Sequence, residues 1–228
     1  MKKNYSCFDP TQLTCISASE QKAGKGQRGK QWISPKGSNL YFSLYYVLPK
    51  SFFWRGNLSQ ITSLWLVLAL KEICQVQLSI KWPNDLFLGN NKIAGILIEI
   101  EESPALLHVI TGIGINVDLS DEQLTSIDQP ASFLSQQIEK KLLQRKKLQE
   151  QLFSFIKDKV KRLKDGLEDH WVDQVNAYFY KKKEMFFKDF KHKFPIKDYR
   201  LDSLGYLEIS LRKEDGYNRV KAGSLSMH

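Results

Sequence analysis

The strongest constraint on the fold is a pair of short apolar segments joined by polar corners. Lys81-Trp82-Pro83-Asn84-Asp85-Leu86 ends one strand-like segment, and Lys92-Ile93-Ala94-Gly95-Ile96-Leu97 begins another. Gly89-Asn90-Asn91 between them predicts a turn, because glycine and asparagine tolerate positive φ. The pattern predicts one hairpin that gathers the polar side chains of Lys81, Asn84, Asp85 and Lys92. Core packing does not require such a set, which can hold a nucleotide phosphate and its metal ion.

A glycine- and cation-rich segment lies upstream, Gly24-Lys25-Gly26-Gln27-Arg28-Gly29-Lys30-Gln31-Trp32. Glycines allow backbone N–H groups to turn toward an anion, and the cations add charge. The segment is neither a P-loop nor a dinucleotide-binding fingerprint, because the Gly-Lys-Ser/Thr ending and the strand-turn-helix context are absent. Taken alone, it fits a flexible basic loop equally well. With residues 34–41 it is expected to close one side of a pocket, with Trp32 as a planar apolar wall.

A third segment is Gly112-Ile113-Gly114-Ile115-Asn116-Val117. Glycines weaken a buried strand unless another group must approach the backbone closely. Asn116 lies between apolar residues and therefore needs buried hydrogen-bond partners. Two interpretations stay open for this segment alone: a ligand-facing strand, or a bulge with a satisfied core asparagine.

Apolar periodicity predicts an α+β fold, with a mixed, largely antiparallel sheet and flanking helices. Strands are expected at residues 13–19, 39–48, 78–82, 93–99 and 108–117, with a long loop at 21–38. A helix is expected over 57–74, with Asn57 as its N-cap. Surface helices are expected at 131–138, 142–163 and 167–178.

The chain changes character near residue 181, which predicts two domains, 1–180 and 181–228. Short β-like bursts at 184–187, 199–201, 206–211 and 219–221 are separated by turns at 203–205 and 214–216. Short strands at this spacing predict a small β-barrel.

Composition limits the partners and the compartment. The 228 residues are 42% hydrophobic and 26% charged, which is typical of a globular protein. Three cysteines without metal-ligand spacing, and no long apolar run, predict a cytoplasmic protein outside the membrane. The net charge of +9 is concentrated at 140–164 and 181–193, interpreted as a solvated helix face and a lysine-rich linker. Such a surface also steers acidic protein partners, and specific DNA binding is not expected.

In this order and at this spacing, the three segments resemble the catalytic domain of biotin protein ligases. The family patterns are Gly-Arg-Gly-Arg-x-Gly-Arg-x-Trp, Lys-Trp-Pro-Asn-Asp, Lys-x-Ala-Gly-Ile-Leu and Gly-x-Gly-Ile-Asn. The resemblance covers residues 19–118, and the tail resembles the small SH3-like C-terminal domain of the family. It implies a class II synthetase-like fold and the formation of biotinyl-5′-AMP from biotin and ATP. Biotin then passes to a lysine of the biotin carboxyl carrier protein or domain of a carboxylase.

The resemblance also implies roles for individual residues. Lys92 would be catalytic, lying between the biotin carboxylate and the α-phosphate. The residues implied to bind biotin or the adenylate are Gln21, Gly24, Lys25, Gly26, Gln27, Arg28, Gly29, Trp32, Lys92, Gly95, Leu97, Gly112, Ile115 and Asn116. Lys81, Asn84 and Asp85 would serve the nucleotide and Mg²⁺, which would arrive with ATP rather than occupy a fixed protein metal site.

The chain departs from the family pattern at two places. Gln27 stands where the pattern has arginine, so a positive charge is missing from the loop. The family's Ser-Thr-Asn segment, about twenty residues before the loop, has no counterpart upstream of Gln21, and no N-terminal DNA-binding domain is expected. Alternatives that stay open are a lipoate ligase on the same fold, a non-catalytic biotin- or adenylate-binding protein and, last, a nucleic-acid-binding module. A homodimer is compatible with each of these.

Overall fold

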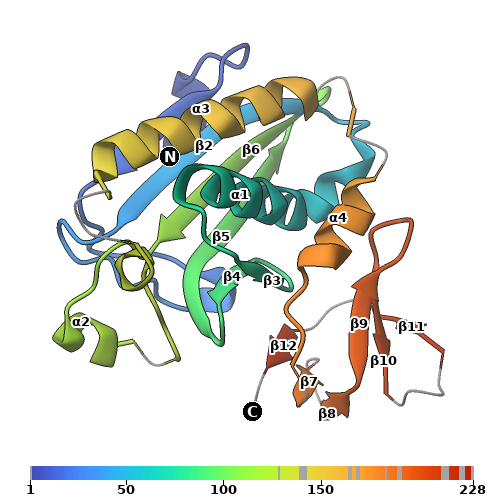
Figure 1. Cartoon of the computed structure of the whole chain (residues 1–228). Helices are drawn as coiled ribbons and strands as arrows, with labels where there is room; N and C mark the ends of the chain where they lie inside the picture. The colour runs from blue at the N-terminus through green and yellow to red at the C-terminus, as the bar shows by residue number, and fades with distance from the viewer. Residues whose placement is uncertain are drawn as a thin grey trace.

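The computed structural model describes residues 2–127, 129–138, 143–163, 166–167, 170–182, 184–188, 192–211, 216–220 and 224–226. Its largest element is a six-stranded antiparallel sheet in the order β1-β2-β6-β5-β4-β3 (Figure 1). The strands are β1 (Thr14–Ala18), β2 (Leu40–Pro49), β3 (Ser79–Lys81), β4 (Asp85–Leu88), β5 (Asn91–Glu102) and β6 (Leu106–Ile115). The predicted α+β class with a largely antiparallel sheet is confirmed.

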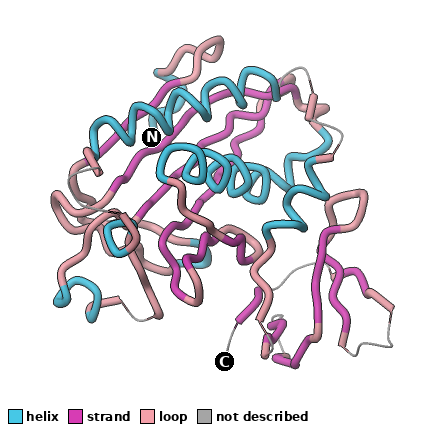
Figure 2. The backbone as a smooth tube through the Cα atoms, in the orientation of Figure 1, coloured by secondary structure: helices cyan, strands magenta, loops and turns pink. Residues whose placement is uncertain are grey.

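Two helices cover one face of this sheet, α1 (Leu58–Cys74) and α3 (Arg145–Leu163) (Figures 1 and 2). Helix α1 is apolar on most sides because it lies between the sheet and its neighbours, with Leu58, Leu66 and Leu70 fully buried. Helix α3 buries a single stripe, which consists of Leu148, Leu152, Ile156, Val160 and Leu163. That spacing is the apolar face of an amphipathic helix, and its charged face is turned to solvent.

The opposite face of the sheet carries the glycines of β5 and β6 at alternate positions. Toward β1 this face is closed by the N-terminal 3-10 segment Lys2–Cys7, where Tyr5 packs against Tyr45, Val47 and Ile110. Toward β4 it is lower, because Gly95 and Gly114 are cross-strand partners without side chains, and the ring of Trp32 lies there. The glycine pattern therefore produces a shallow floor on this side of the sheet.

The C-terminal residues form two three-stranded sheets, in the orders β12-β7-β8 and β11-β10-β9. Their strands are β7 (Met185–Lys188), β8 (Lys193–Ile196), β9 (Asp198–Leu201), β10 (Leu207–Ser210), β11 (Asn218–Arg219) and β12 (Ser224–Ser226). We call these sheets the C-terminal module. The predicted division at residue 180 and the SH3-like barrel stay predictions.

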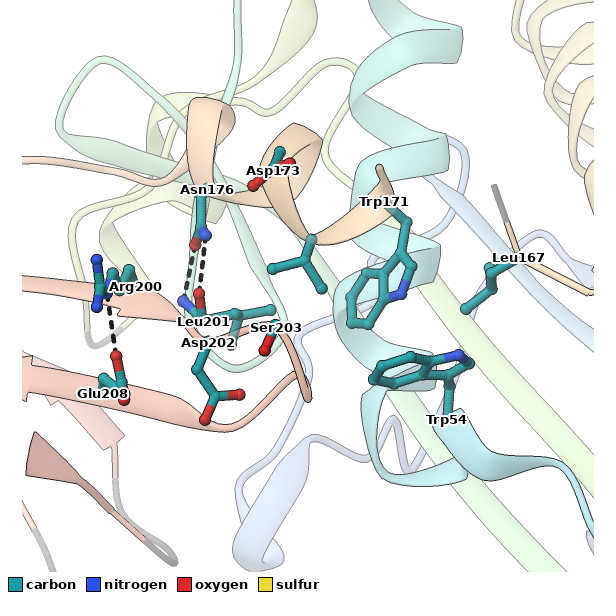
Figure 3. A pocket seen from close by; sticks show the side chains of 11 residues that line it. Trp54, Leu167, Trp171, Asp173, Asn176, Arg200, Leu201, Asp202, Ser203 and Glu208 are labelled. Carbon is teal, nitrogen blue, oxygen red and sulfur yellow. Dashed lines mark hydrogen bonds and ion pairs between the residues drawn. The ribbon is translucent and has the colours of Figure 1, made fainter. Parts of the chain in front are cut away.

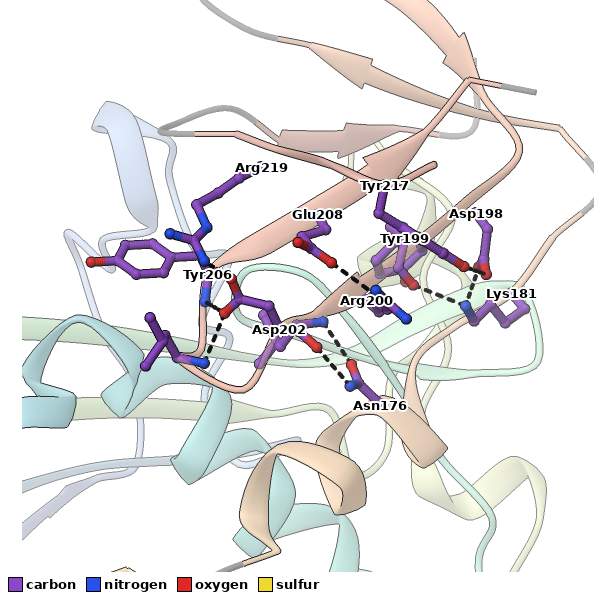
Figure 4. Close-up of polar contacts among 12 residues, drawn as sticks. Asn176, Lys181, Asp198, Tyr199, Arg200, Asp202, Tyr206, Glu208, Tyr217 and Arg219 are labelled. Carbon is purple, nitrogen blue, oxygen red and sulfur yellow. Dashed lines mark hydrogen bonds and ion pairs between the residues drawn. The ribbon is translucent and has the colours of Figure 1, made fainter. Parts of the chain in front are cut away.

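The module is attached to helix α4 (Trp171–Tyr178) by side-chain hydrogen bonds to its backbone (Figure 4). Asn176 donates from Nδ2 to the Leu201 carbonyl at 2.9 Å and accepts at Oδ1 from the Leu201 N–H at 2.7 Å. Asn57 adds a second attachment, since its Nδ2 donates to the Gly205 carbonyl at 2.7 Å.

Several sequence predictions need correction. Asn57 is the residue before α1, but its side chain makes no capping bond because it binds the module instead. Residues 131–138 contain only the 3-10 turn Leu134–Gln136 rather than a helix. Helix α4 is shorter than the predicted 167–178 segment. The predicted lysine-rich linker contains β7 and the start of β8.

The sequence reading missed helix α2 (Asp121–Thr125). Its N-terminus is a capping box, in which the Ser120 hydroxyl accepts from the Gln123 N–H and the Gln123 side chain accepts from the Ser120 N–H. The parts of earlier predictions at 140–142, 164, 168–169, 183, 189–191, 214–215 and 221–223 lie outside the described residues. Within the described part of the chain, no helix combines the length and apolar character needed to span a membrane.

Candidate active site

An open cleft of about 1010 Å³ lies on the glycine floor of the large sheet. Its walls come from several separate parts of the chain. These are the glycine-lysine loop (21–32), Phe42 and Ser43 of β2, the corner at 81–85, residues of β5 and β6, Gln129, and residues Lys188, Lys193 and Leu225 of the C-terminal module. The cleft therefore brings the three motifs of the sequence together, and it adds a contribution from the tail.

Lys92 and Asp85 form an ion pair on one wall of the cleft. The Lys92 Nζ lies 2.7 Å from the Asp85 Oδ1, and the two side chains are only 12% and 18% exposed. The predicted single hairpin is in fact two consecutive hairpins, with Asp85 at the start of β4 and Lys92 near the start of β5. A register shift between Leu86 and Phe87 places Asp85 opposite Gly95, and the side chain of Lys92 reaches back to it.

The backbone of Lys92 is fixed on its other side. Its N–H donates to the Pro130 carbonyl at 3.0 Å, and its carbonyl accepts from the Ser132 N–H at 2.9 Å. Above the ion pair, the Lys92 Nζ lies 5.2 Å from the centre of the Trp32 ring, which is within cation–π range. The ammonium is therefore held by an anion, an aromatic face and a rigid strand.

The Pro83-Asn84 corner is held by hydrogen bonds to the core. Asn84 donates from Nδ2 to the Ile96 carbonyl at 2.6 Å, and the Ile96 N–H donates to the Asn84 carbonyl at 3.0 Å. Gln60 of the buried helix α1 donates from Nε2 to the Pro83 carbonyl at 3.1 Å. The Trp82–Pro83 peptide bond is cis. These contacts fix Asp85 at the edge of the cleft.

Lys81 contributes a second, partly buried ammonium group beside the ion pair. Burial lowers its pKa below the ordinary lysine value of 10.5, and the positive charges of Lys92 and Lys30 lower it further, against an opposing effect of Asp85. Its Nζ lies 5.1 Å from the centre of the Phe87 ring. Because burial and neighbouring cations disfavour the charged form of Lys81, binding of an anion beside its ammonium group is favourable.

Trp32 packs against the glycine floor. A Cβ atom on Gly114 would come within 2.5 Å of the Trp32 ring, and one on Gly95 within 2.9 Å, so both positions require glycine. The Trp32 Nε1 atom is buried, and among the described residues it has no hydrogen-bond partner. The predicted aromatic wall is thus a ring that covers the strand backbones directly.

The glycine-lysine loop is a compact turn rather than an extended strap. Lys25 and Gln31 form an antiparallel bridge, and the Trp32 N–H donates to the Gly24 carbonyl at 2.9 Å. Gly24 has no room for a side chain, because a Cβ there would lie 2.3 Å from the Trp32 carbonyl oxygen. Gln21 accepts at Oε1 from the Ser34 hydroxyl at 2.8 Å, which ties the loop base to the following segment.

Most residues implied by the resemblance line this cleft, but not all. Those on its wall are Gln21, Lys25, Gly26, Gln27, Arg28, Trp32, Lys81, Asn84, Asp85, Lys92, Gly95, Leu97 and Gly112. Gly29 lines a separate hollow outside the loop. Gly24, Ile115 and Asn116 line neither, and the last two are buried in the core.

Asn116 has structural partners throughout. It donates from Nδ2 to the Ser132 carbonyl at 3.1 Å, and its Oδ1 accepts from Asn39 at 3.4 Å. The second sequence interpretation, a satisfied core asparagine, describes this geometry. Sequence reasoning did not include Ser43, Gln129, Lys188, Lys193 or Leu225, which also line the cleft. The alternation of side chains between the two faces of β2 indicates that Ser43 faces the cleft. For the tail residues, nothing in the neighbouring sequence indicates a place on the cleft wall.

A second hollow, of about 530 Å³, lies between α4 and the C-terminal module (Figure 3). Trp54 and Trp171 form one wall, packed edge to face with ring centres 5.0 Å apart. Its charged side chains are engaged within the protein, since Arg200 pairs with Glu208 and Asp202 pairs with Arg219. In this hollow Arg200 and Asp202 already have partners of opposite charge, whereas the wall of the cleft carries an excess of cations.

A known protein family and several known proteins match the N-terminal half of the chain. Residues 5–116 match the biotin/lipoate A/B protein ligase family. The chain is 39% identical over 105 residues to the biotin--[acetyl-CoA-carboxylase] ligase of Paracoccus denitrificans, covering 45% of this chain and 43% of that one. It is 34% identical over 116 residues to the bifunctional ligase/repressor BirA of Escherichia coli (strain K12), covering 50% of this chain and 36% of that one. The matched segment therefore spans less than half of either relative.

Solved structures extend the similarity to the whole chain. The biotin protein ligase from Aquifex aeolicus, in complex with biotin and ATP, superposes with a TM-score of 0.73 at 28% identity. That match covers 93% of this chain and 87% of the other, so it includes the C-terminal module. On the family match and the motifs gathered in the cleft, residues 5–116 of this chain belong to the biotin/lipoate A/B protein ligase family.

Proposed function

We propose that this protein is a biotin protein ligase. It joins biotin to ATP as biotinyl-5′-AMP, releases pyrophosphate, and transfers biotin to a lysine of a carboxylase's biotin carboxyl carrier protein or domain. The observation that carries the proposal is the Lys92–Asp85 pair on the wall of a cleft lined by basic loop residues and a glycine floor. The relatives named above, which are ligases for biotin, support the choice of substrate.

The first step is an attack of a biotin carboxylate oxygen on the α-phosphorus of ATP. The bond from this phosphorus to the oxygen of the β-phosphate breaks, and its electron pair leaves with pyrophosphate. Two anions must approach each other, so the main task of the protein is to neutralise and position them. Lys92 meets this need, because its ammonium is held at one point by Asp85 and Trp32.

In the second step, the amine of the acceptor lysine attacks the carbonyl carbon of the mixed anhydride. AMP leaves with the bridging oxygen, and the attacking nitrogen loses a proton. Lys92 can stabilise the phosphate oxygens of departing AMP from the same position. A nucleophile on the protein is not required, since the adenylate is itself the activated intermediate.

In the proposed reaction, Mg²⁺ would enter this cleft as a companion of the nucleotide. Among the described residues, no group of three histidine, cysteine, aspartate or glutamate side chains could hold a metal ion. Asp85 and the Asn84 amide supply oxygen atoms of the kind Mg²⁺ prefers, and phosphate oxygens and water would complete its coordination. Mg²⁺ would reduce the charge of the triphosphate, while Asp85 and Asn84 would orient it.

The test uses the purified chain with ATP, Mg²⁺, biotin and a carrier domain with one acceptor lysine. We expect a mass increase of one biotinyl group on that lysine, and none on a carrier whose acceptor lysine is replaced by arginine. Competition between biotin and lipoate tests the substrate: preferential attachment of lipoate would make the protein a lipoate ligase. Biotin binding with neither pyrophosphate release nor transfer would make it a binding protein and refute the proposal.

A further inference from the structure

Two lysines of the C-terminal module belong to the wall of the cleft. Lys188 in β7 and Lys193 in β8 are direct cross-strand partners, and both line the cleft together with Leu225 of β12. Directly opposed residues of antiparallel strands lie on one face, with Cβ atoms about 5 Å apart. Like charges in this arrangement repel each other, so an anion that lies between the two ammonium groups stabilises the pair.

The rest of the cleft wall is also strongly cationic. Among the described residues that line it, the basic side chains are Lys25, Arg28, Lys30, Lys81, Lys92, Lys188 and Lys193. The acidic side chains of the same described wall are Asp85 and Glu99. This excess of positive charge matches a ligand that carries several negative charges in a row, such as a triphosphate.

The direction of the reaction separates the tasks of these cations. The biotin carboxylate and the leaving pyrophosphate must lie on opposite sides of the α-phosphorus, because displacement at phosphorus is close to in line. In the proposed function, Lys92 serves the point where carboxylate and α-phosphate meet. The β- and γ-phosphates therefore need cations on another part of the wall, away from the carboxylate.

We infer that Lys188 and Lys193 bind the β- and γ-phosphates of ATP and stabilise them as they leave as pyrophosphate. This inference rests on the proposed ligase function and assigns a task to the C-terminal module within it. A lysine ammonium suits the position because it acts as a compact point charge toward phosphate oxygens. Lys193 also has its Nζ 4.6 Å from the centre of the Phe186 ring, which orients the side chain.

The alternative role for a basic pair at a cleft mouth is to attract an acidic carrier domain. ATP is favoured because both lysines line the same hollow as Lys92 and Asp85. The two roles act on different half-reactions. Binding of the distal phosphates affects formation of the adenylate, whereas docking of the carrier affects transfer from it.

The experiment measures both half-reactions for the double variant Lys188→Gln/Lys193→Gln. We expect the KM for ATP to rise by about tenfold or more, as the loss of charge-assisted hydrogen bonds predicts. Inhibition by added pyrophosphate should weaken by a similar factor, while the KM for biotin stays within about twofold. Transfer from preformed biotinyl-5′-AMP to the carrier should match the wild-type rate.

Two variants control for structure and surface charge. Lys188→Arg/Lys193→Arg keeps both charges and should restore most of the ATP affinity. Lys197→Ala removes an exposed lysine of the same module that lies outside the cleft, and it should leave every parameter unchanged. If the double variant does not fold by circular dichroism, the single variants Lys188→Gln and Lys193→Gln are measured in its place.

A normal KM for ATP in the folded glutamine variants would overturn the inference. A rise in the KM for the carrier, during transfer from preformed adenylate, would assign the pair to the carrier instead and also overturn it. Failure of the wild-type chain to form the adenylate under the same conditions would refute the proposed function itself. The wild-type reaction therefore separates the two claims.

Discussion

The Lys92 Nζ lies 2.7 Å from the Asp85 Oδ1, across two consecutive hairpins and largely shielded from solvent. The pair is not expected to add much to the free energy of folding, because the attraction between two mostly buried charges is largely offset by the cost of desolvating them. It does hold the Lys92 ammonium in one position before any substrate is present. We interpret Asp85 as an internal anion that holds Lys92 in place until the carboxylate and phosphate arrive.

Replacing Lys92 with alanine should abolish adenylation. The ammonium is expected to contribute about 3 kcal/mol of transition-state stabilisation, equivalent to a few hundredfold in rate. The measurement is biotin-dependent release of pyrophosphate at saturating ATP and biotin. Lys50→Ala removes a lysine from an exposed ion pair with Glu102 and should retain full activity.

Loss of Lys92 also leaves Asp85 without its partner, which lowers stability for a reason unrelated to catalysis. The double variant Lys92→Ala/Asp85→Asn removes both charges, so its Tm should recover toward that of the wild type. Its activity should stay as low as that of Lys92→Ala. Pyrophosphate release that recovers together with Tm would mean that Lys92 acts only through folding.

Gly114→Ala should damage the cleft more than Gly112→Ala does. A Cβ on Gly114 would lie 2.5 Å from the Trp32 ring, so the ring must move, whereas the nearest atom to a Cβ on Gly112 is 3.7 Å away. Overpacking of this kind costs about 1–3 kcal/mol. We expect a raised KM for biotin and quenched or shifted Trp fluorescence for Gly114→Ala. Equal effects of both substitutions would show that Trp32 does not depend on the glycine floor.

The KM for ATP should rise with pH because of Lys81. Its pKa is lowered, chiefly by burial and then by Lys92 and Lys30, so it loses its proton at a lower pH than the ordinary value of 10.5. Phosphate binds the protonated form, and affinity therefore falls as the pH climbs through the lowered pKa. Lys81→Arg stays charged over this range, so its KM for ATP should remain flat at alkaline pH. Parallel curves for both proteins would exclude Lys81 as the titrating group.

Asn57→Ala should loosen the C-terminal module. The side chain donates to the Gly205 carbonyl at 2.7 Å, and loss of one such bond costs about 1 kcal/mol. For a chain of this size that corresponds to a Tm lower by about 2–4 °C. Asn218→Ala, at an exposed position in β11, should leave Tm unchanged. An unaffected Asn57→Ala would mean that the module is held by other contacts.

The large sheet could be predicted because its strands have local signals. Turn glycines, β-branched residues and alternation mark 39–48, 93–99 and 108–117, and the structure has strands β2, β5 and β6 there. The glycines at 112 and 114 also signalled a close approach to the backbone, which Trp32 makes at Gly114. These features depend on neighbours in the sequence, so they can be read without tertiary information.

Other features depend on partners far along the chain. Asn57 is a residue type typical of an N-cap, but its side-chain amide donates to the carbonyl of residue 205 instead of capping α1. The sequence around Asn116 is compatible with a ligand contact and with a core residue. Only the position of Ser132, whose carbonyl accepts from the Asn116 side chain, distinguishes the two interpretations. Lys188 and Lys193 belong to a lysine-rich stretch that resembles a linker, and only strand pairing places them on the cleft.

The most direct test of the account follows an oxygen atom. The protein is incubated with ATP, Mg²⁺, carrier domain and biotin whose carboxylate carries ¹⁸O, and the products are analysed by mass spectrometry. If the carboxylate attacks the α-phosphorus in this cleft, one ¹⁸O atom passes to AMP when the acceptor lysine displaces it. AMP without the label, with ¹⁸O in pyrophosphate or phosphate instead, would contradict the account.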